Sequence, residues 1–412
     1  MPRSALSRFF APSGIPADAG LLLWTRGARA FGDGFMSLLL PFYLTLLGFS
    51  AFDVGLIVTA TLLGSGIMTL VVGMIAHRYR SRSLLLAASL LMAATGAAVV
   101  FATDFWPLLI VAFVGTLNPS AGDVSVFSPL EHSLLARMAN PRSRTVLFAR
   151  YSLVGALIGA IGAQAASLPT LATHFFALDT KTALQGMFVL YGMLGVACLP
   201  LYRGLSPQID THEEAQQPTP LGKSKRIVYT LAALFSIDAF AGGFAVQSLL
   251  ALWLFDRFQL SVGTAGTIFF WVGILGALSQ LVAARIAARF GLINTMVFTH
   301  IPSSIFLMLV PFMPNLPLAL LFLFLRSALS QMDVPARTSY VMAVVSPGER
   351  PAAASVTAVP RSLAAAISPA FAGYLLSLSA FGWPLVICGG LKIAYDLLLL
   401  KMFSRVKPPE ET

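Results

Sequence analysis

Charged residues are scarce in this chain of 412 residues. Asp, Glu, Lys and Arg together make up 11% of it and hydrophobic residues 57%, whereas a soluble globular domain carries roughly 25% charged residues. The mean hydropathy is +0.82. So few charges exclude a chain that is solvated mainly by water, and they indicate that lipid covers much of its surface.

Residues and motifs for metal, disulfide and nucleotide chemistry are scarce as well. The two cysteines, Cys198 and Cys388, both lie inside apolar runs, which indicates neither a disulfide framework nor a metal site. The five histidines have no metal-ligand spacing, and no phosphate loop of the Walker type is present. We therefore expect that the chain is not an enzyme, has no cofactor and is not an ATP-driven pump.

Long apolar runs recur along the whole chain instead. A run of about 20 residues crosses a hydrocarbon core of roughly 30 Å as a helix. Backbone polar groups must pair in lipid, which leaves helices or a closed barrel. Barrel strands alternate apolar and polar residues, and stretches such as 83–102, SLLLAASLLMAATGAAVVFA, do not. The sequence therefore predicts an all-α integral membrane protein.

The apolar runs divide into two sets of six around one extended polar segment. This segment, residues 204–226, is rich in Pro, Gln and Glu and is predicted to be a flexible connector. It separates an N-terminal six-helix bundle, 1–203, from a C-terminal one, 227–412. The twelve predicted helices are 20–46, 53–76, 83–103, 106–135, 146–168, 183–203, 227–256, 262–288, 293–313, 317–345, 352–377 and 382–404.

Lys and Arg cluster in every second loop between these helices, which predicts the orientation of the chain. Such loops stay in the cytoplasm, so we expect a multi-pass protein of the inner (plasma) membrane with both termini and the central connector cytoplasmic. The net charge of +10 comes largely from these clusters. Because no basic face with interleaved aromatics accompanies it, no nucleic-acid partner is expected.

A pair of charged motifs repeats between the halves. Asp123-Val recurs as Asp333-Val after 210 residues (333 − 123), and an arginine follows each: Arg150 is 27 residues on (150 − 123) and Arg361 is 28 (361 − 333). With an even number of helices in each half, the two halves run parallel about a pseudo-two-fold axis along the membrane normal. Charges repeated in two halves of a lipid-soluble chain are typical of a transporter.

The chain resembles the major facilitator superfamily (MFS) over nearly its whole length. The family's basic turn after the second helix is matched by Gly73, Ile75, Arg78 and Arg82, with His77 at the position of the usual Asp. Ile286, Arg289 and Gly291 match it in the second half, with Ala288 at the Asp position. The sequence AAAISPAFAG in helix 11 is similar to a stretch of drug-proton antiporters. The resemblance implies two pseudo-symmetric six-helix bundles that rock around a central cavity for a small-molecule substrate, in a protein for which a monomer suffices.

Three charges lie deep in the predicted first helices of the two halves. A charge at the bilayer centre costs roughly 3 kcal/mol on insertion scales, so it needs a partner or a wet cavity. Arg29 and Asp33 are four residues apart and can pair on one helix face. Asp238 occupies the repeat position of Arg29 (238 − 29 = 209). These residues are either a substrate and proton site, with Asp33 and Asp238 as proton carriers, or structural ion pairs.

The remaining polar and charged residues fall into three groups. As further substrate-binding residues we consider Arg326, which is deep in helix 10, Asn118 before Pro119 at a break in helix 4, and the polar or aromatic residues Tyr43, Gln247 and Trp271. The charged residues Glu131 and Arg337 are interpreted as interfacial and His300 as a packing or hydrogen-bonded residue. The gating candidates, which are alternatively permanent structural pairs, are Asp123, Arg150, Asp333, Arg361, Arg78 and Arg289.

Together these features predict a proton-coupled secondary active transporter that works by alternating access. Our first hypothesis is efflux of a small organic compound, driven by the proton gradient. The alternative is transport of an organic anion, which Arg29 and Arg326 favour. A third hypothesis is a membrane receptor or assembly protein that transports nothing.

Overall fold

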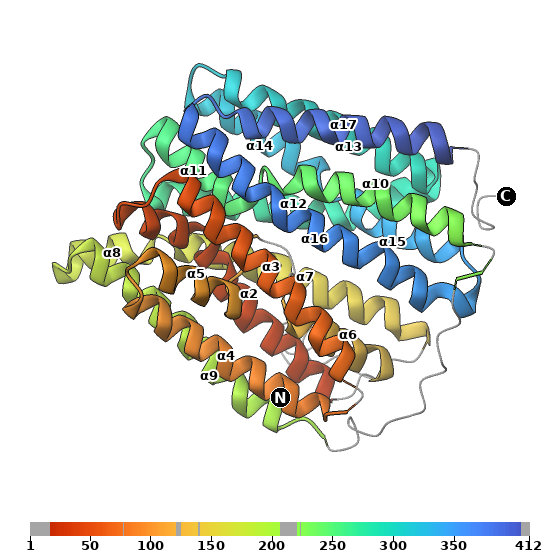
Figure 1. Ribbon diagram of the computed structural model, residues 1–412, viewed down its shortest axis with the longest axis horizontal. Coiled ribbons are helices and arrows are strands. Elements are labelled where there is room, and N and C mark those ends of the chain that lie inside the picture. Colours follow the sequence, from red (N-terminus) through yellow and green to blue (C-terminus); the bar gives the residue numbers. More distant parts are fainter. Residues whose placement is uncertain are drawn as a thin grey trace, which may run out of the picture. The chain divides into compact units, whose positions relative to one another are not determined.

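The computed structural model describes residues 17–76, 78–120, 125–138, 141–206, 221–222 and 224–404. Within these ranges the chain is built from helices and contains no strand (Figure 1). Eight helices of the described part are long and apolar enough to cross a membrane. The all-α membrane fold is thus confirmed, and the number of twelve crossings stays a prediction.

The chain folds into two compact units. Unit 1 comprises Met1–Gly48, Gly64–Glu214 and Ser261–Phe270, and unit 2 comprises Phe49–Leu63, Ala215–Leu260 and Trp271–Thr412. Two helices, α3 (Ala51–Ile75) and α12 (Val262–Phe290), therefore contribute residues to both units. Most of the predicted connector lies outside the described residues, and the division of the chain at 204–226 stays a prediction.

Unit 1 is organised around its first helix. Helix α2 (Ala17–Leu46) packs against α7 (Pro141–Ala165) and α9 (Thr180–Arg203), and α4 (Ser81–Phe101) also packs against α9. The approach of α2 to α7 depends on glycine, because a Cβ at Gly162 would lie 2.1 Å from the carbonyl oxygen of α2 residue 31. The small residues of the α7 segment 155–163, GALIGAIGA, thus allow α7 to pack close to α2.

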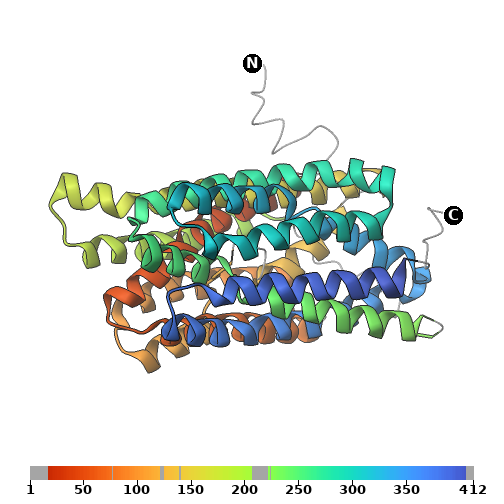
Figure 2. The same ribbon diagram turned by 90° about the horizontal axis from the view of Figure 1, so that it is seen from above.

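Unit 2 repeats the same packing with the second half of the chain. Helix α10 (Lys225–Gly243) packs against α16 (Arg350–Leu378) and α17 (Trp383–Phe403), and α13 (Leu292–Leu309) packs against α17. Figure 2 shows α10 and α17 side by side, in green and dark blue. The internal repeat expected from the sequence therefore extends to which helices pair within each unit.

Three of the predicted helices are each broken into two. The segments 227–256 and 317–345 were expected to be continuous, which is wrong, whereas the break within 106–135 was indicated by Asn118 before Pro119. Two glycines end α10 at Gly243. In the predicted segment 317–345, Pro335 lacks the backbone N–H that a continuous helix would need. The resulting pairs are α5 (Phe105–Val114) with α6 (Phe127–Met138), α10 with α11 (Gln247–Phe258), and α14 (Leu316–Leu329) with α15 (Asp333–Ala343).

Short segments complete the described chain. A helix that the sequence did not predict, α8 (Leu168–Phe176), follows α7, and the 3-10 helices η2 (Val310–Phe312) and η3 (Pro347–Glu349) follow α13 and α15. Helix α8 begins at the Leu-Pro of residues 168–169, and a proline is well suited to the first turn of a helix because its missing N–H has no partner there.

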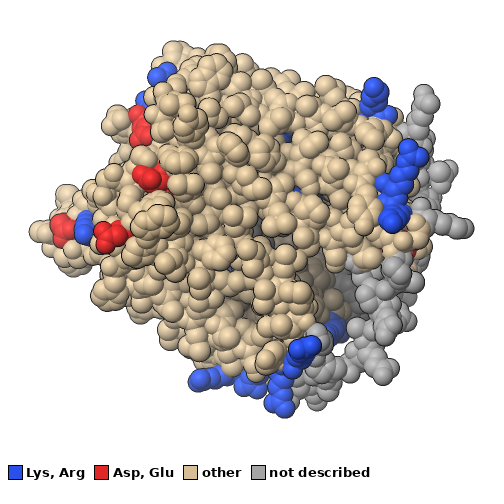
Figure 3. Space-filling view, viewed as in Figure 1, with Lys and Arg blue, Asp and Glu red and all other residues tan. Residues whose placement is uncertain are grey.

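The outer surface of the helices is apolar. Most of the face seen in Figure 3 carries neither Lys and Arg nor Asp and Glu. Large side chains such as Phe101, at 84% exposure, and Trp106, at 70%, project outward from it. Exposed apolar area of this extent indicates contact with a membrane or another apolar partner. Together with the apolar helices it identifies a surface solvated by lipid.

Candidate functional site

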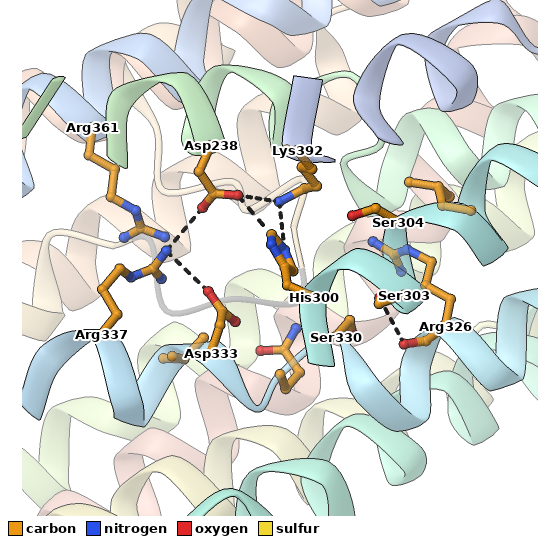
Figure 4. Close-up of a pocket in the computed structure, with 14 residues that line it drawn as sticks. Asp238, His300, Ser303, Ser304, Arg326, Ser330, Asp333, Arg337, Arg361 and Lys392 are labelled. Carbon is orange, nitrogen blue, oxygen red and sulfur yellow. Dashed lines mark hydrogen bonds and ion pairs between the residues drawn. The ribbon is translucent and has the colours of Figure 1, made fainter. Parts of the chain in front are cut away.

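A cavity of about 190 Å³ lies inside unit 2 and is lined mainly by charged and hydroxyl-bearing side chains (Figure 4). Its charged residues come from α10, α13, α14, α15, α16 and α17, so nearly every helix of the repeat contributes to it. The cationic side chains that line it are Arg326, Arg337, Arg361 and Lys392, and the carboxylates are Asp238 and Asp333.

Asp238 is the centre of this group of charges. Lys392 Nζ donates to its Oδ1 at 2.6 Å, and Arg337 Nη1 donates to its Oδ2 at 3.0 Å. Its side chain is buried, and His300 Nε2 lies 3.9 Å from Oδ1. Each oxygen of the carboxylate thus has a cationic partner, which is the arrangement that makes a buried charge tolerable.

His300 connects the centre of the cavity to a second buried carboxylate. Its Nδ1 lies 3.0 Å from Asp396 Oδ2, and its Nε2 lies 3.3 Å from Lys392 Nζ. An ammonium group has only donors, so Nε2 accepts and Nδ1 carries the proton that is donated to Asp396. His300 is thus a hydrogen-bonded residue, one of the two interpretations that the sequence allowed, and its partners on both sides are charged groups.

At the other end of the cavity, Asp333 pairs with Arg337 and not with Arg361, the arginine that follows it in the repeated motif. Asp333 Oδ2 pairs with Arg337 Nη1 at 3.3 Å, one turn along α15. Asp333 was expected to pair with Arg361, but Arg361 has no carboxylate within 4.0 Å among the described residues, and its Nε is buried without a hydrogen-bond partner. Arg337, interpreted from sequence as interfacial, is therefore the bridge between Asp238 and Asp333. We call Asp238, His300, Asp333, Arg337, Lys392 and Asp396 the Asp238 cluster.

Unit 1 contains a second buried group of charges, centred on Glu131. Arg29 Nη2 donates to Glu131 Oε2, Tyr151 donates to the same oxygen at 2.5 Å, and Tyr202 donates to Oε1 at 2.5 Å. Thr25 Oγ1 lies 3.0 Å from Oε1, and Glu131 is 0% exposed. We call these five residues the Glu131 cluster.

The expected pairing of Arg29 with Asp33 is thereby corrected. Within the described residues the ion pair of Arg29 is with Glu131 of α6, and Asp33 Oδ2 accepts from Asn118 Nδ2 at 3.3 Å. Four residues of spacing place Arg29 and Asp33 on one face, but the neighbouring helix supplies the nearer partners. Glu131 was interpreted as interfacial, and it is instead fully buried.

The two clusters are related by the internal repeat with their charges reversed. Arg29 and Asp238 are repeat equivalents, and their partners Glu131 and Arg337 are 206 residues apart (337 − 131), on the equivalent helices α6 and α15. In unit 1 the first helix carries the cation, and in unit 2 it carries the anion. An ion pair between these two helices is therefore kept while its polarity is inverted.

Asn118 lies at the break between α5 and α6, as its position before Pro119 predicted. Its Nδ2 donates to Asp33, and its Oδ1 accepts from the Ser120 amide at 3.1 Å and from the Ser120 hydroxyl at 2.9 Å. The amide therefore holds the irregular backbone and orients the Asp33 carboxylate at the same time.

Other predicted site residues are not brought to the unit 2 cavity. Tyr43 is fully buried in unit 1, where Gln185 Nε2 donates to its hydroxyl at 3.3 Å. Trp271 is 51% exposed, and Gln247 is the first residue of α11; neither lines this cavity.

The predicted gating residues are dispersed. Arg78 and Arg289 are exposed, Arg150 is partly buried, and Asp123 lies outside the described residues. Of the predicted gating residues in the described part, only Asp333 and Arg361 line the cavity. The role of all six in gating stays a prediction.

Lys392 and Asp396 are the site residues that sequence reasoning missed. Both lie in α17, four residues apart in an otherwise apolar run. The cost of a charge in the membrane, which identified Asp238 and Arg326, applies equally to them. That signal was present in the sequence. Among the described residues no group of His, Cys, Asp and Glu side chains has the arrangement needed to hold a metal ion.

A further carboxylate lies in the loop before α16, outside the apolar helices. Glu349 accepts hydrogen bonds from the Gly222 amide and from the Ser224 and Ser346 hydroxyls. These donors favour the ionised form, and they lower the pKa of Glu349 to about 2. The contacts tie the residues just before α10 to the segment that leads into α16.

Comparison with known proteins identifies the family of this architecture. The family model described as Major Facilitator Superfamily matches residues 22–255 and 231–412. The "Uncharacterized membrane protein YJR124C" of Saccharomyces cerevisiae is 25% identical over 426 residues, covering 93% of this chain and 94% of its own length.

Two solved structures are similar in fold. A bacterial homologue of the human lysosomal transporter Spinster, in an inward-facing and occupied conformation, has a TM-score of 0.75 at 15% identity and covers 94% of this chain and 97% of its own. The nucleoside transporter NupG has a TM-score of 0.73 at 13% identity, with 94% and 99% coverage.

Proposed function

Because this multi-pass membrane protein belongs to the major facilitator superfamily, a family of transporters and not of enzymes, we propose that it is a proton-coupled secondary active transporter. It exports a small organic compound by alternating access. The observation that carries this proposal is the charged cavity of unit 2, because a membrane bundle retains charges of this kind where they line a route or site for a solute or ion.

Proton coupling is assigned to Asp33 and Asp238. These carboxylates lie in α2 and α10, the helices that correspond to each other in the two halves of the chain. Asp33 is 9% exposed and is held by Asn118, a neutral partner. Asp238 is held by two cations, Lys392 and Arg337. Protonation of Asp238 therefore requires those cations to move or to find another anion. Asp33 and Asp238 are both candidates for the proton carrier.

The second candidate function, transport of an organic anion, is favoured by the charge balance of the cavity. Four cationic side chains line it and only two carboxylates do. If Asp396 is counted, which touches His300 but does not line the cavity, cations still exceed carboxylates by four to three. NupG is named for nucleosides, so the shared fold alone does not choose among substrates.

The proposed setting is an inner plasma membrane, with both chain termini in the cytoplasm and a monomer as the transporting form. The clusters of Lys and Arg in alternate loops support this orientation. One charge that crosses 100 mV gains about 2.3 kcal/mol, enough for roughly fifty-fold accumulation. A single proton per cycle is therefore a sufficient driving force for export.

The test is a transport assay in reconstituted vesicles with an imposed pH gradient and a wide panel of organic compounds. Wild-type protein should accumulate at least one compound against its gradient. Asp33→Asn should abolish proton-driven transport and leave counterflow exchange partly intact. Full active transport by that variant would remove Asp33 from the mechanism, and the absence of any flux across the panel would favour a receptor or assembly protein.

A further inference from the structure

Arg326 is a cation of the unit 2 cavity that, like Arg361 at the other end, has no carboxylate within 4.0 Å among the described residues. Lys392 and Arg337, by contrast, both pair with Asp238, and Arg337 also pairs with Asp333. Arg326 lies in α14 and lines the cavity. Its backbone oxygen accepts from the Ser303 hydroxyl at 3.2 Å and from the Ser330 amide at 2.9 Å.

A hydroxyl without a partner lies at the same end of the cavity. Ser304 is 2% exposed, lines the cavity, and its Oγ has no hydrogen-bond partner among the described residues. Figure 4 shows the Arg326 guanidinium beside Ser304, with Ser303 and Ser330 near it and Arg361 at the far end of the cavity. A buried hydroxyl left unpaired is costly, so its position beside an unpaired guanidinium indicates a group that both would bind.

The chemistry of that group follows from the two side chains. A guanidinium presents a planar fork of donors that matches two oxygens of a carboxylate or phosphate. A serine hydroxyl beside it donates a further hydrogen bond. The nearby side chains of this end, Ser303 and Ser330, also carry hydroxyls, and no carboxylate in the lining lies between Arg326 and Ser304 to repel an anion.

We propose that Arg326 and Ser304 form a binding site for an oxyanion, the carboxylate or phosphate of a small organic ligand. The inference rests on the proposed function and narrows its substrate to compounds that carry such a group. Arg29, which the sequence ranked together with Arg326, is excluded from this role because Glu131 neutralises it in unit 1. The remainder of the ligand faces the Asp238 cluster, where Lys392 and His300 line the adjoining part of the cavity.

The site is tested by equilibrium binding to the purified full-length protein in lipid nanodiscs. Two matched pairs separate charge from shape: benzoate with benzamide, and adenosine monophosphate with adenosine. At least one anion should bind more tightly than its neutral counterpart, and the pair that responds shows whether a carboxylate or a phosphate is preferred. Charged hydrogen bonds contribute about 1.5–3 kcal/mol each, so Arg326→Gln should weaken the anion by roughly ten- to a hundredfold.

Three further variants show whether a loss of anion binding comes from the site itself and not from misfolding of the protein. Arg326→Lys retains the charge and should recover part of the affinity, Ser304→Ala should weaken the anion by several-fold, and Arg257→Gln removes an exposed arginine and should change nothing. Neutral compounds should bind equally to all of them. The proposal is overturned if no anion binds better than its neutral partner, or if Arg326→Gln and Ser304→Ala both leave anion affinity at the wild-type value.

Transport measured on the same variants separates this site from the proposed function. If wild-type protein moves a neutral compound and binds neither anion, the oxyanion site is wrong and the transporter stands. If an anion binds through Arg326 and Ser304 and no compound crosses the vesicle membrane, the site stands and the transporter is wrong.

Discussion

The Glu131 cluster of unit 1 and the Asp238 cluster of unit 2 occupy equivalent places in the two halves and differ in what they leave open. Glu131 is fully buried and receives donors from Arg29, Tyr151 and Tyr202. The Asp238 cluster borders a cavity in which, among the described residues, the Arg326 guanidinium has no carboxylate within 4.0 Å and the Ser304 hydroxyl has no hydrogen-bond partner. A buried charge by itself is therefore not a site: the site is where the packing leaves donors unsatisfied.

The difference follows from the donors that surround each carboxylate. Two tyrosine hydroxyls and one guanidinium supply Glu131 with neutral and charged hydrogen bonds but add only one positive charge. Asp238 is satisfied by Lys392 and Arg337, and Arg337 also pairs with Asp333. The positive surplus of the unit 2 cavity therefore comes from Arg326 and Arg361, which have no carboxylate within 4.0 Å among the described residues, whereas the pair of Arg29 and Glu131 is neutral.

The largest effect is expected from breaking the ion pair of unit 1. Glu131→Gln leaves the Arg29 guanidinium buried without its carboxylate, and removing one partner of a buried pair costs roughly 3–5 kcal/mol. We expect a marked loss of stability, measured as the unfolding temperature in detergent. A variant as stable as wild type would show that Arg29 has another sufficient partner and that the cluster is not a structural core.

A smaller loss of stability is expected from the corresponding change in unit 2. Lys392→Gln leaves Asp238 with Arg337, and the cavity admits water to the other oxygen, so the unfolding temperature should fall much less than in Glu131→Gln. Transport should suffer more, through a higher KM for anionic substrates. Equal destabilisation by both variants would remove the distinction between a closed cluster and an open one.

Single hydrogen bonds of the Glu131 cluster should contribute less again. Tyr202→Phe keeps the ring, which stacks on Phe127, and removes the hydroxyl that lies 2.5 Å from Glu131. A hydrogen bond to a charged group contributes about 1.5–3 kcal/mol, so the loss should be below that of Glu131→Gln. Thermal unfolding of the single and double variants checks the order, because Tyr202→Phe should have little effect once Glu131 is already glutamine.

The smallest effect concerns Glu349, which lies outside both clusters. Its pKa is lowered from 4.5 to about 2, so its stabilising contacts are complete above the unfolded value and are lost as the pH falls from about 4.5 towards 2. Between pH 5 and 8 hydrogen exchange at the Gly222 amide should show no titration from this group. Glu349→Gln should speed that exchange modestly between pH 5 and 8, where wild-type Glu349 is ionised, and a pH-dependent step near neutrality in wild type would contradict the assignment.

Sequence reasoning located most of the charges but assigned few of their partners. The cost of a charge in lipid singled out Asp238, Asp333, Arg326 and Arg361, all of which line the cavity. Spacing along one helix suggested that Arg29 pairs with Asp33, whereas its partner Glu131 is 102 residues away. Lys392 and Asp238 are 154 residues apart. Partners on different helices leave no spacing signal in a single sequence.

The positions of the helix breaks could likewise be predicted only in part. Asn118-Pro119 indicated the interruption between α5 and α6, because a proline lacks the backbone N–H that a helix needs. Nothing as strong marks the end of α10, where glycines 242 and 243 precede the turn before α11. Packing around these residues decides whether such a glycine stays helical, which is why the predicted helix 227–256 was wrong and the break after residue 118 was anticipated.

What the sequence alone determined is the solvent of this protein and the repeat within it. An apolar chain with few charges requires lipid, and two charged motifs in register require two related halves. Only the tertiary structure decided which charges neutralise each other and which remain open to a cavity. The physical reason is that ion pairing and burial depend on distances of a few ångströms between helices far apart in the chain, and those distances are set by packing.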